Sequence, residues 1–170
     1  MSPLQAPSSL ELTPWIAYME NMVPALLPFH QSSSAIRLLL GGNGTGKTTS
    51  GSWEATCFST GYNPIRDEAY PTPNEGWAVC LRLKDQGPIL RDALSRMLPQ
   101  VLARDGSPHP GWKYYKQSDV FELKKGVPGA GSIIRFKQQE DGSEAFFGGR
   151  PLWIWVDEEK KGQVGERNFN

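Results

Sequence analysis

The stretch AIRLLLGGNGTGKT, residues 35–48, decides the fold class of this chain. It opens with a short apolar run that reads as a buried strand ending at Gly41. The glycine-rich loop that follows fits the pattern G-x-x-x-x-G-K-[ST], with Gly41 and Gly46 as its fixed glycines. Residues 47–60 can form a helix that stops at Gly61. Because the loop joins a strand to a helix, we predict that it binds phosphate rather than serving only as a turn.

The chemistry of such a loop depends on its backbone and on two side chains. Glycines let consecutive N–H groups curl around phosphate oxygens, and the helix directs its positive end at them. Lys47 is expected to reach the β- and γ-phosphates, and the Thr48 hydroxyl to ligate Mg²⁺. ATP and Mg²⁺ are therefore the predicted cofactors. The predicted nucleotide-binding residues are Gly41, Gly42, Asn43, Gly44, Thr45, Gly46, Lys47, Thr48 and Thr49.

A second motif, LWIWVDEE at residues 152–159, is the natural partner of this loop. Five apolar residues end in a carboxylate, where the carboxyl edge of a sheet meets a ligand. We predict that Asp157 holds Mg²⁺ and that Glu158 accepts a proton from the attacking water. An adjacent glutamate favours hydrolysis over transfer to a second metabolite, so an ATPase is preferred to a small-molecule kinase. Taken alone, the motif could also be a solvated acidic turn.

Strands and helices alternate along the rest of the chain. The expected elements are a short helix at residues 15–27 broken near Pro24, strands at Trp77–Leu83, Val120–Leu123 and Ser132–Lys137, the last two as a hairpin, and a helix at Asp85–Leu98. Residues 61–76 and 104–112 are expected to be loops. This order predicts an α/β P-loop NTPase fold with three layers and a largely parallel sheet. We expect residues 1–33 to be an N-terminal arm and lid-like short helix, and residues 34–170 the ATPase core.

Composition narrows the class of protein. The 170 residues favour one domain, and 18 basic against 18 acidic residues give no net charge. This balance argues against disorder and against a protein that coats DNA through overall basicity. Two cysteines are too few for a disulfide framework and suggest a reducing compartment. The sequence offers no membrane span and no basic leader, so we expect an intracellular protein with no membrane partner.

The remaining candidates carry weaker predictions. The basic pairs Lys113/Lys116, Lys124/Lys125 and Arg135/Lys137, with Tyr114 and Tyr115 between them, could line a DNA path, although ordinary solvated loops and a hairpin rim are the favoured interpretation. His30 and His109 are expected at the surface. Core packing is expected for Trp77, Trp153 and Trp155, and burial for Cys57 and Cys80.

The motifs in this order resemble the ATPase part of the large terminase subunit of tailed bacteriophages. PFHQSSSAIRLLLGGNGTGKT at residues 28–48 is similar to the family's Phe-His-x-Ser segment and Gly-Gly-Asn P-loop. GWAVCLRLKDQG at 76–87 looks like the next strand–helix unit. IIRFKQQEDGSEAFFGGRPLWIWVDEE at 133–159 resembles the family's Phe-Lys strand, Phe-Gly step and Trp-rich Walker B strand. The last block is the most specific of the three.

The resemblance implies a motor that pumps double-stranded DNA into a capsid in the host cytoplasm. It implies a homo-oligomeric ring, with the portal protein and the small terminase subunit as partners. Lys47 and Thr48 would take the Walker A roles, Asp157 the Mg²⁺ role and Glu158 that of catalytic base. Some members have an arginine before the Gly of the Phe-Gly step; here Phe147 stands in that place and Arg150 is the nearest catalytic substitute. Gln31 stands at a different offset from the family's adenine-reading glutamine.

Only 13 residues follow Asp157. We therefore expect a partial protein, cut short after Walker B, without the family's coupling strand and nuclease domain. Two other functions stay open. One is a helicase-like or recombination P-loop ATPase, which free single-stranded DNA would stimulate. The other is a nucleotide-binding fragment without turnover.

Overall fold

A computed structural model of the chain describes residues 14–42, 44–103, 106–142, 146 and 149–157. The fold is mixed α/β. Its helices are α1 (Pro14–Asn21), η1 (Pro24–Leu26), α2 (Leu27–Gln31), α3 (Lys47–Thr60), α4 (Gly87–Met97) and η2 (Gln139–Asp141). Its strands are β1 (Tyr62–Asn63), β2 (Glu68–Ala69), β3 (Glu75–Cys80), β4 (Gln100–Leu102), β5 (Pro108–Pro110), β6 (Trp112–Tyr115), β7 (Val120–Leu123), β8 (Ile133–Gln138) and β9 (Trp153–Val156).

The main sheet has five strands in the order β6-β7-β8-β3-β9. β3 pairs in parallel with β8 and with β9, whereas β7 pairs antiparallel with both β6 and β8. The sheet is therefore mixed, and the expectation of a largely parallel sheet is wrong. The connections from β6 to β7 and from β7 to β8 are shorter than the dozen or so residues that a parallel crossover needs.

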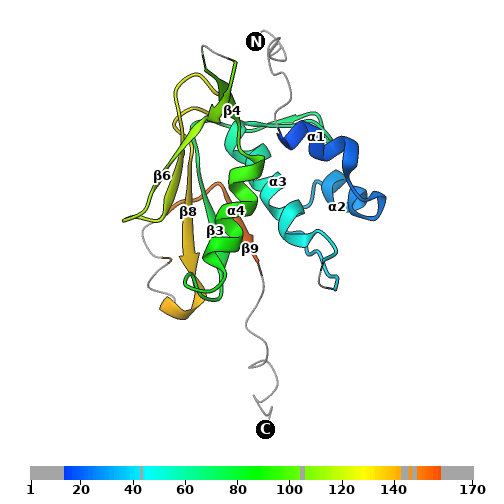
Figure 1. The fold of residues 1–170 in the computed structure, drawn as a ribbon. Helices are drawn as coiled ribbons and strands as arrows, with labels where there is room; N and C mark the ends of the chain where they lie inside the picture. The colour runs from blue at the N-terminus through cyan, green and yellow to red at the C-terminus, as the bar shows by residue number, and fades with distance from the viewer. Residues whose placement is uncertain (1–13, 43, 104–105, 143–145, 147–148, 158–170) are drawn as a thin grey trace.

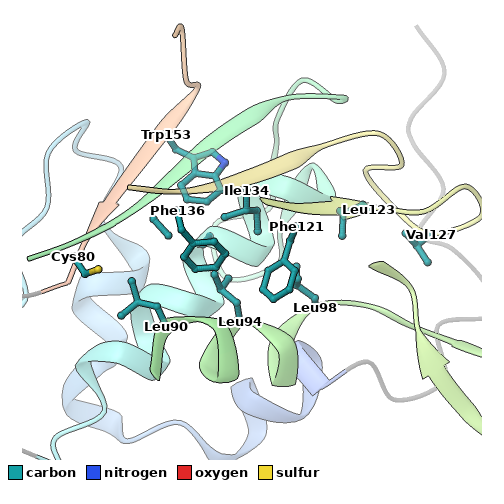
Figure 2. Packing of buried hydrophobic residues seen from close by; sticks show 12 residues of the cluster. Cys80, Leu90, Leu94, Leu98, Phe121, Leu123, Val127, Ile134, Phe136 and Trp153 are labelled. Carbon is teal, nitrogen blue, oxygen red and sulfur yellow. The ribbon is translucent and has the colours of Figure 1, made fainter. Parts of the chain in front are cut away.

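The helices α3 and α4 cover one face of this sheet, and α1 and α2 lie beyond α3 (Figure 1). Apolar side chains from the covered face meet Leu90 and Leu94 of α4 and Leu98 directly after it (Figure 2). Strand residues in this core are Ala78, Cys80, Phe121, Leu123, Ile134, Phe136 and Trp153. No α-helix among the described residues lies on the opposite face. The described chain thus has two layers, where three were expected.

Several expected elements are present at nearly the expected bounds. α3 begins at Lys47 and ends against Gly61, whose backbone is left-handed with φ of 90°. α4, β7, β8 and β9 follow the apolar patterns that predicted them, and the first helix ends before Pro24. The expected loop at 61–76 contains the β1–β2 hairpin, and the expected loop at 104–112 contains β5, which pairs with β4 before it. These strands are only two or three residues long, too short to show an alternation of apolar and polar residues in the sequence.

The strand expected immediately before the P-loop is absent. Residues 35–40 form no ladder with any strand of the described chain. Ile36, Leu38 and Leu40 are 90%, 74% and 79% exposed, while Arg37 and Leu39 between them are partly buried. The apolar run therefore does not make a buried strand here: β9 is the edge strand of the described sheet, and residues 35–40 do not pair with it.

Candidate nucleotide-binding site

The P-loop joins residues 35–40 to the N-terminus of α3. Gly44 and Gly46 have φ angles of 76° and 85°, a left-handed conformation that side chains rarely adopt. Gly46 caps α3, and its carbonyl accepts the first helical hydrogen bond, from Ser50 N at 2.8 Å. The positive end of the α3 dipole therefore faces the loop, which favours an anion there.

Two side chains fold back onto the loop. Lys47 Nζ donates to the carbonyls of Gly41 and Gly42, each at 2.7 Å. Thr45 Oγ1 donates to the Gly42 carbonyl at 2.8 Å. A Cβ placed on Gly41 would lie 2.7 Å from Thr45 Oγ1, so a glycine suits this close approach. These contacts place the Lys47 ammonium at the loop that its motif assigns to phosphate.

Asp157 and Thr48 lie side by side, although 109 residues separate them in the sequence. Thr48 Oγ1 lies 3.2 Å from both carboxylate oxygens of Asp157 and donates to them. Asp157 N donates to Val79 O at 2.8 Å, so the carboxylate stands where β9 ends beside β3. Two oxygens that ligate one Mg²⁺ at right angles, each about 2.1 Å from it, lie about 3 Å apart. The hydroxyl and the carboxylate thus fit a shared Mg²⁺.

The tryptophans of β9 explain how Asp157 reaches α3. Trp153 and Trp155 point to the helical face, whereas Ile154 and Val156 between and after them are about half exposed. Trp153 lies across Gly76 of β3, and Trp155 lies against Gly51 of α3, so that a Cβ on either glycine would overlap an indole. Figure 2 shows Trp153 over the core side of the sheet. Glycines on two neighbouring elements therefore make room for the strand that carries Asp157.

The other predicted site residues are placed as follows. Asn43 and Glu158 lie outside the described residues. Arg150 is exposed. Thr49 is partly buried in the first turn of α3, and its carbonyl accepts a hydrogen bond from Ser52 Oγ at 2.8 Å. Gln31 is exposed at the end of α2.

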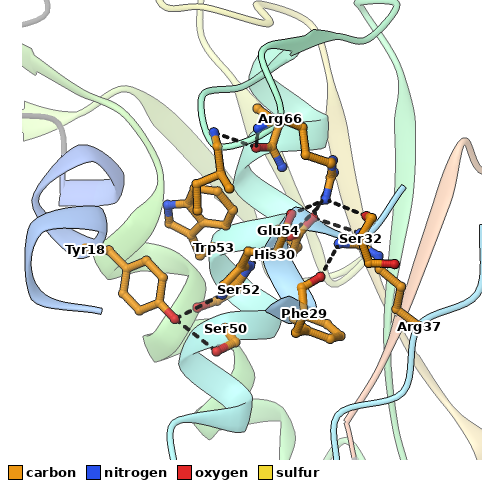
Figure 3. Close-up of polar contacts among 12 residues, drawn as sticks. Tyr18, Phe29, His30, Ser32, Arg37, Ser50, Ser52, Trp53, Glu54 and Arg66 are labelled. Atoms are coloured by element: carbon orange, nitrogen blue, oxygen red, sulfur yellow. Dashed lines mark hydrogen bonds and ion pairs between the residues drawn. The ribbon is translucent and has the colours of Figure 1, made fainter. Parts of the chain in front are cut away.

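A buried polar cluster beside the P-loop was missed from the sequence (Figure 3). Its centre is Glu54 of α3, which is 5% exposed. His30 Nδ1 lies 2.8 Å from Oε1 of Glu54, and the second ring nitrogen lies 3.2 Å from the Tyr18 hydroxyl. Arg37 and Arg66 donate to Oε2 at 2.8 and 3.2 Å. The available signal was that Glu54 is the only charged residue of α3 after Lys47.

The structure tests the predicted burial of the two histidines and the two cysteines. His30 is completely buried, so its expected place at the surface is wrong, because Glu54 and Tyr18 satisfy both ring nitrogens. His109 is exposed as predicted. Cys57 and Cys80 are buried as predicted, and burial raises the pKa of both thiols, that of Cys80 to about 11. Neither thiol is therefore poised as a nucleophile.

The surroundings of Glu54 favour its charged form. Burial raises the pKa of this carboxyl, but hydrogen bonds from His30 and Arg37 and the charges of Arg37 and Arg66 lower it by more. The net pKa is below its ordinary value. Glu54 is therefore a carboxylate at neutral pH, buried beside two guanidinium groups.

A second surface carries the basic residues that were considered for DNA. Lys113, Lys124 and Lys125 line a shallow hollow of about 400 Å³ with Tyr115 and Glu122. Lys113 Nζ lies 4.5 Å from the Tyr115 ring centre, and Lys124 Nζ donates to Pro110 O at 3.0 Å. Arg135, by contrast, is paired with Glu75 at 3.2 Å. The hollow lies at the β6–β7 end of the sheet, away from β9.

Comparisons with known proteins identify no relative of this chain: no family model, no curated protein and no solved structure matches it. In the part of the chain that the structure describes, no helix is long and apolar enough to cross a membrane. No group of three or more His, Cys, Asp or Glu residues gathers there either. A Mg²⁺ held by Thr48 and Asp157 would therefore take further ligands from phosphate and water.

Proposed function

We propose that this chain binds ATP with Mg²⁺ at the P-loop. The observation that carries the proposal is the contact between Thr48 and Asp157, because two motifs that lie 109 residues apart in the sequence meet at one point. The left-handed glycines and the N-terminus of α3 supply backbone donors for phosphate, and Lys47 supplies a positive charge beside them. Bound Mg²⁺ would neutralise charge on the β- and γ-phosphates.

We further propose that the bound nucleotide is hydrolysed by in-line attack of water on the γ-phosphate. In this mechanism the chain contributes mainly position and charge. Lys47 and the loop N–H groups hold the phosphates, Thr48 and Asp157 orient the metal side of the site, and Glu158 accepts the proton of the attacking water. Arg150 is the proposed cation for charge that develops in the transition state, in this subunit or a neighbour.

The biological role that we propose is the motor part of a DNA-packaging terminase large subunit. It rests on the motif resemblance, with double-stranded DNA, the portal protein and the small terminase subunit as proposed partners and a ring as the proposed assembly. The hollow lined by Lys113, Lys124 and Lys125 supports a contact with a polyanion. Proposed alternatives are a helicase or recombination ATPase and a nucleotide-binding fragment without turnover.

The binding proposal is tested by titrating the chain with Mg-ATP by calorimetry. We expect Lys47→Ala to raise the Kd by at least about tenfold, because one charged phosphate contact is worth about 1.5–3 kcal/mol. Lys84→Ala, at an exposed lysine outside the site, is the matched control and leaves the Kd unchanged. Equal affinity of wild type and Lys47→Ala for Mg-ATP would overturn the site assignment.

Turnover and the DNA role need separate measurements. Phosphate release above that of Lys47→Ala separates hydrolysis from simple binding, and Glu158→Gln is expected to bind ATP but not to hydrolyse it. Stimulation by free single-stranded DNA favours the helicase alternative, whereas dependence on double-stranded DNA and portal favours packaging. A chain that binds ATP yet releases no phosphate under any of these conditions is the inert fragment.

A further inference from the structure

The P-loop has two limbs, and the structure holds them in different ways. The outgoing limb is the first turn of α3, fixed by helical hydrogen bonds. The incoming limb, residues 35–40, pairs with no described strand, and its side chains at 36, 38 and 40 are exposed. Neither a sheet ladder nor apolar packing of those side chains therefore fixes the incoming limb.

Arg37 supplies the tie that the incoming limb otherwise lacks. It is the only residue of 35–40 with a hydrogen bond to the described chain, donating to Glu54 Oε2 at 2.8 Å and to Phe29 O at 3.3 Å. Its guanidinium also lies over the Phe29 ring, 5.1 Å from the centre. Figure 3 shows Arg37 reaching from its own segment to the centre of the cluster. One side chain thus joins the limb to both α2 and α3.

The opposite end of this tie is itself firmly held. Glu54 lies on the same helix as Lys47 and Thr48, and its carboxylate also contacts His30 and Arg66. The cluster extends along α3 toward the P-loop, because the Tyr18 hydroxyl lies 2.9 Å from Ser50 Oγ. The anchor for the incoming limb is therefore part of the helix that begins the phosphate site.

We propose that Arg37 is a positioning residue for the nucleotide site. Through Glu54 it holds the chain four residues before Gly41, and so sets the place of the loop N–H groups relative to the start of α3. Arg37 touches no phosphate in this role. Its effect on affinity comes from preorganisation, since a loop that is ordered only on binding must lose that conformational freedom at the expense of affinity. The effect on nucleotide binding rests on the proposed function above.

Arg37 is a better test position than Glu54. Removing Glu54 leaves the Arg37 and Arg66 guanidiniums buried without their shared partner, which threatens folding itself. Removing Arg37 leaves the carboxylate with His30 and Arg66. A matched control is Arg91, which donates to Asp119 at 3.0 Å and lies over the rings of Tyr114 in β6 and Phe136 in β8, strands on the other side of β3 from β9.

The first experiment compares the affinity of folded variants for Mg-ATP. We expect Arg37→Ala to raise the Kd by about tenfold, a typical effect of lost preorganisation, while Arg91→Ala leaves it unchanged. Arg37→Lys is expected to fall between wild type and Arg37→Ala, because it keeps the charge but not the forked donors. A Kd unchanged by Arg37→Ala overturns the inference, and so does an equal rise with Arg91→Ala.

The second experiment needs no nucleotide. Amide hydrogen exchange of the ligand-free chain is followed for peptides that cover residues 38–46. Arg37→Ala is expected to speed exchange there by about tenfold or more, as local opening becomes easier, while Arg91→Ala does not. Unchanged exchange in Arg37→Ala overturns the positioning role. If wild type binds no Mg-ATP but exchange rises as expected, the proposed function fails and the tie to the P-loop stands.

Discussion

Two apolar runs directly precede the two parts of the candidate site, the P-loop and Asp157, and the two runs lie in different surroundings. Residues 35–40 lead to the P-loop, and β9 leads to Asp157. In β9 the alternate residues Trp153 and Trp155 turn toward the helices, and the strand pairs in parallel with β3. In 35–40 the alternate residues are exposed, and no strand of the described chain pairs with them.

This difference shows that an apolar sequence allows a segment to form a strand, but that the strand forms only where another strand is available to pair with it. β9 finds β3 on one side, and its flanking amides are bonded, Leu152 N to Glu75 O at 2.7 Å and Asp157 N to Val79 O at 2.8 Å. The incoming limb of the P-loop is tied to the described chain through Arg37, which contacts Glu54 and Phe29. The half of the candidate site that carries Asp157 is thus held by packing and a ladder, and the P-loop half by α3 and the contacts of Arg37.

The largest expected loss of stability comes from removing the charge of Glu54, to which Arg37 is bound. Glu54→Gln leaves two guanidiniums, 13% and 7% exposed, without a carboxylate between them. We expect the free energy of unfolding to fall by about 3 kcal/mol at neutral pH, as for other broken buried ion pairs. Denaturation in urea at pH 7 measures this loss against wild type.

The same measurement at lower pH tests the charge of Glu54, because the pKa of this carboxyl is lowered in the folded chain. Such a group stabilises the fold above its unfolded pKa, near 4.3, and that stability is lost as pH falls through the folded pKa. The gap between wild type and Glu54→Gln should therefore narrow below about pH 4. A gap that stays constant into acid would show that Glu54 is not a stabilising carboxylate.

The next effect tests how β9 is packed. Gly76→Ala puts a methyl group into the Trp153 indole, so β9 must shift away from β3. We expect a loss of about 2 kcal/mol, the usual scale of overpacking. Gly42→Ala is the control, because a Cβ there meets nothing within 4 Å, and its loss should stay within about 0.5 kcal/mol.

A double mutant isolates the contact in question. If Trp153 is the obstacle, Trp153→Leu should reduce the further cost of Gly76→Ala, since the two residues are direct neighbours across the strands. Strictly additive costs would mean that Gly76 is needed for some other reason. The measurement is again the free energy of unfolding, for wild type, both single variants and the double variant.

Much of the fold follows from local signals in the sequence. The helix α3 is marked by the P-loop at its start and Gly61 at its end, and β7 and β8 by apolar runs around a Gly/Pro turn. The antiparallel half of the sheet was predicted only as the β7–β8 hairpin, because β6 was not predicted as a strand. The exposure of residues 35–40 could not be predicted from the segment itself, since it depends on whether another strand pairs with it.

The site divides in the same way. The sequence assigned Thr48 and Asp157 to one predicted Mg²⁺, and the structure places the two side chains in contact at the carboxyl edge of the sheet. The cluster around Glu54 was not predicted, because His30, Arg37 and Arg66 lie on separate segments and obey no common spacing. Buried polar networks of this kind are fixed by tertiary contacts, which a single sequence does not display.

The smallest expected change in stability concerns the exposed apolar side chains of residues 35–40. Ile36→Ser and Leu38→Ser change side chains that are 90% and 74% exposed, so we expect each to alter the free energy of unfolding by less than about 0.5 kcal/mol. Trp153→Ser, on the matching run, removes a side chain that is 6% exposed and should cost roughly 3 kcal/mol or more. A loss above about 1 kcal/mol in Leu38→Ser would mean that this segment packs against the body of the protein in solution. In that case the incoming limb would be held by apolar contacts as well, and the importance of Arg37 for the P-loop would shrink accordingly.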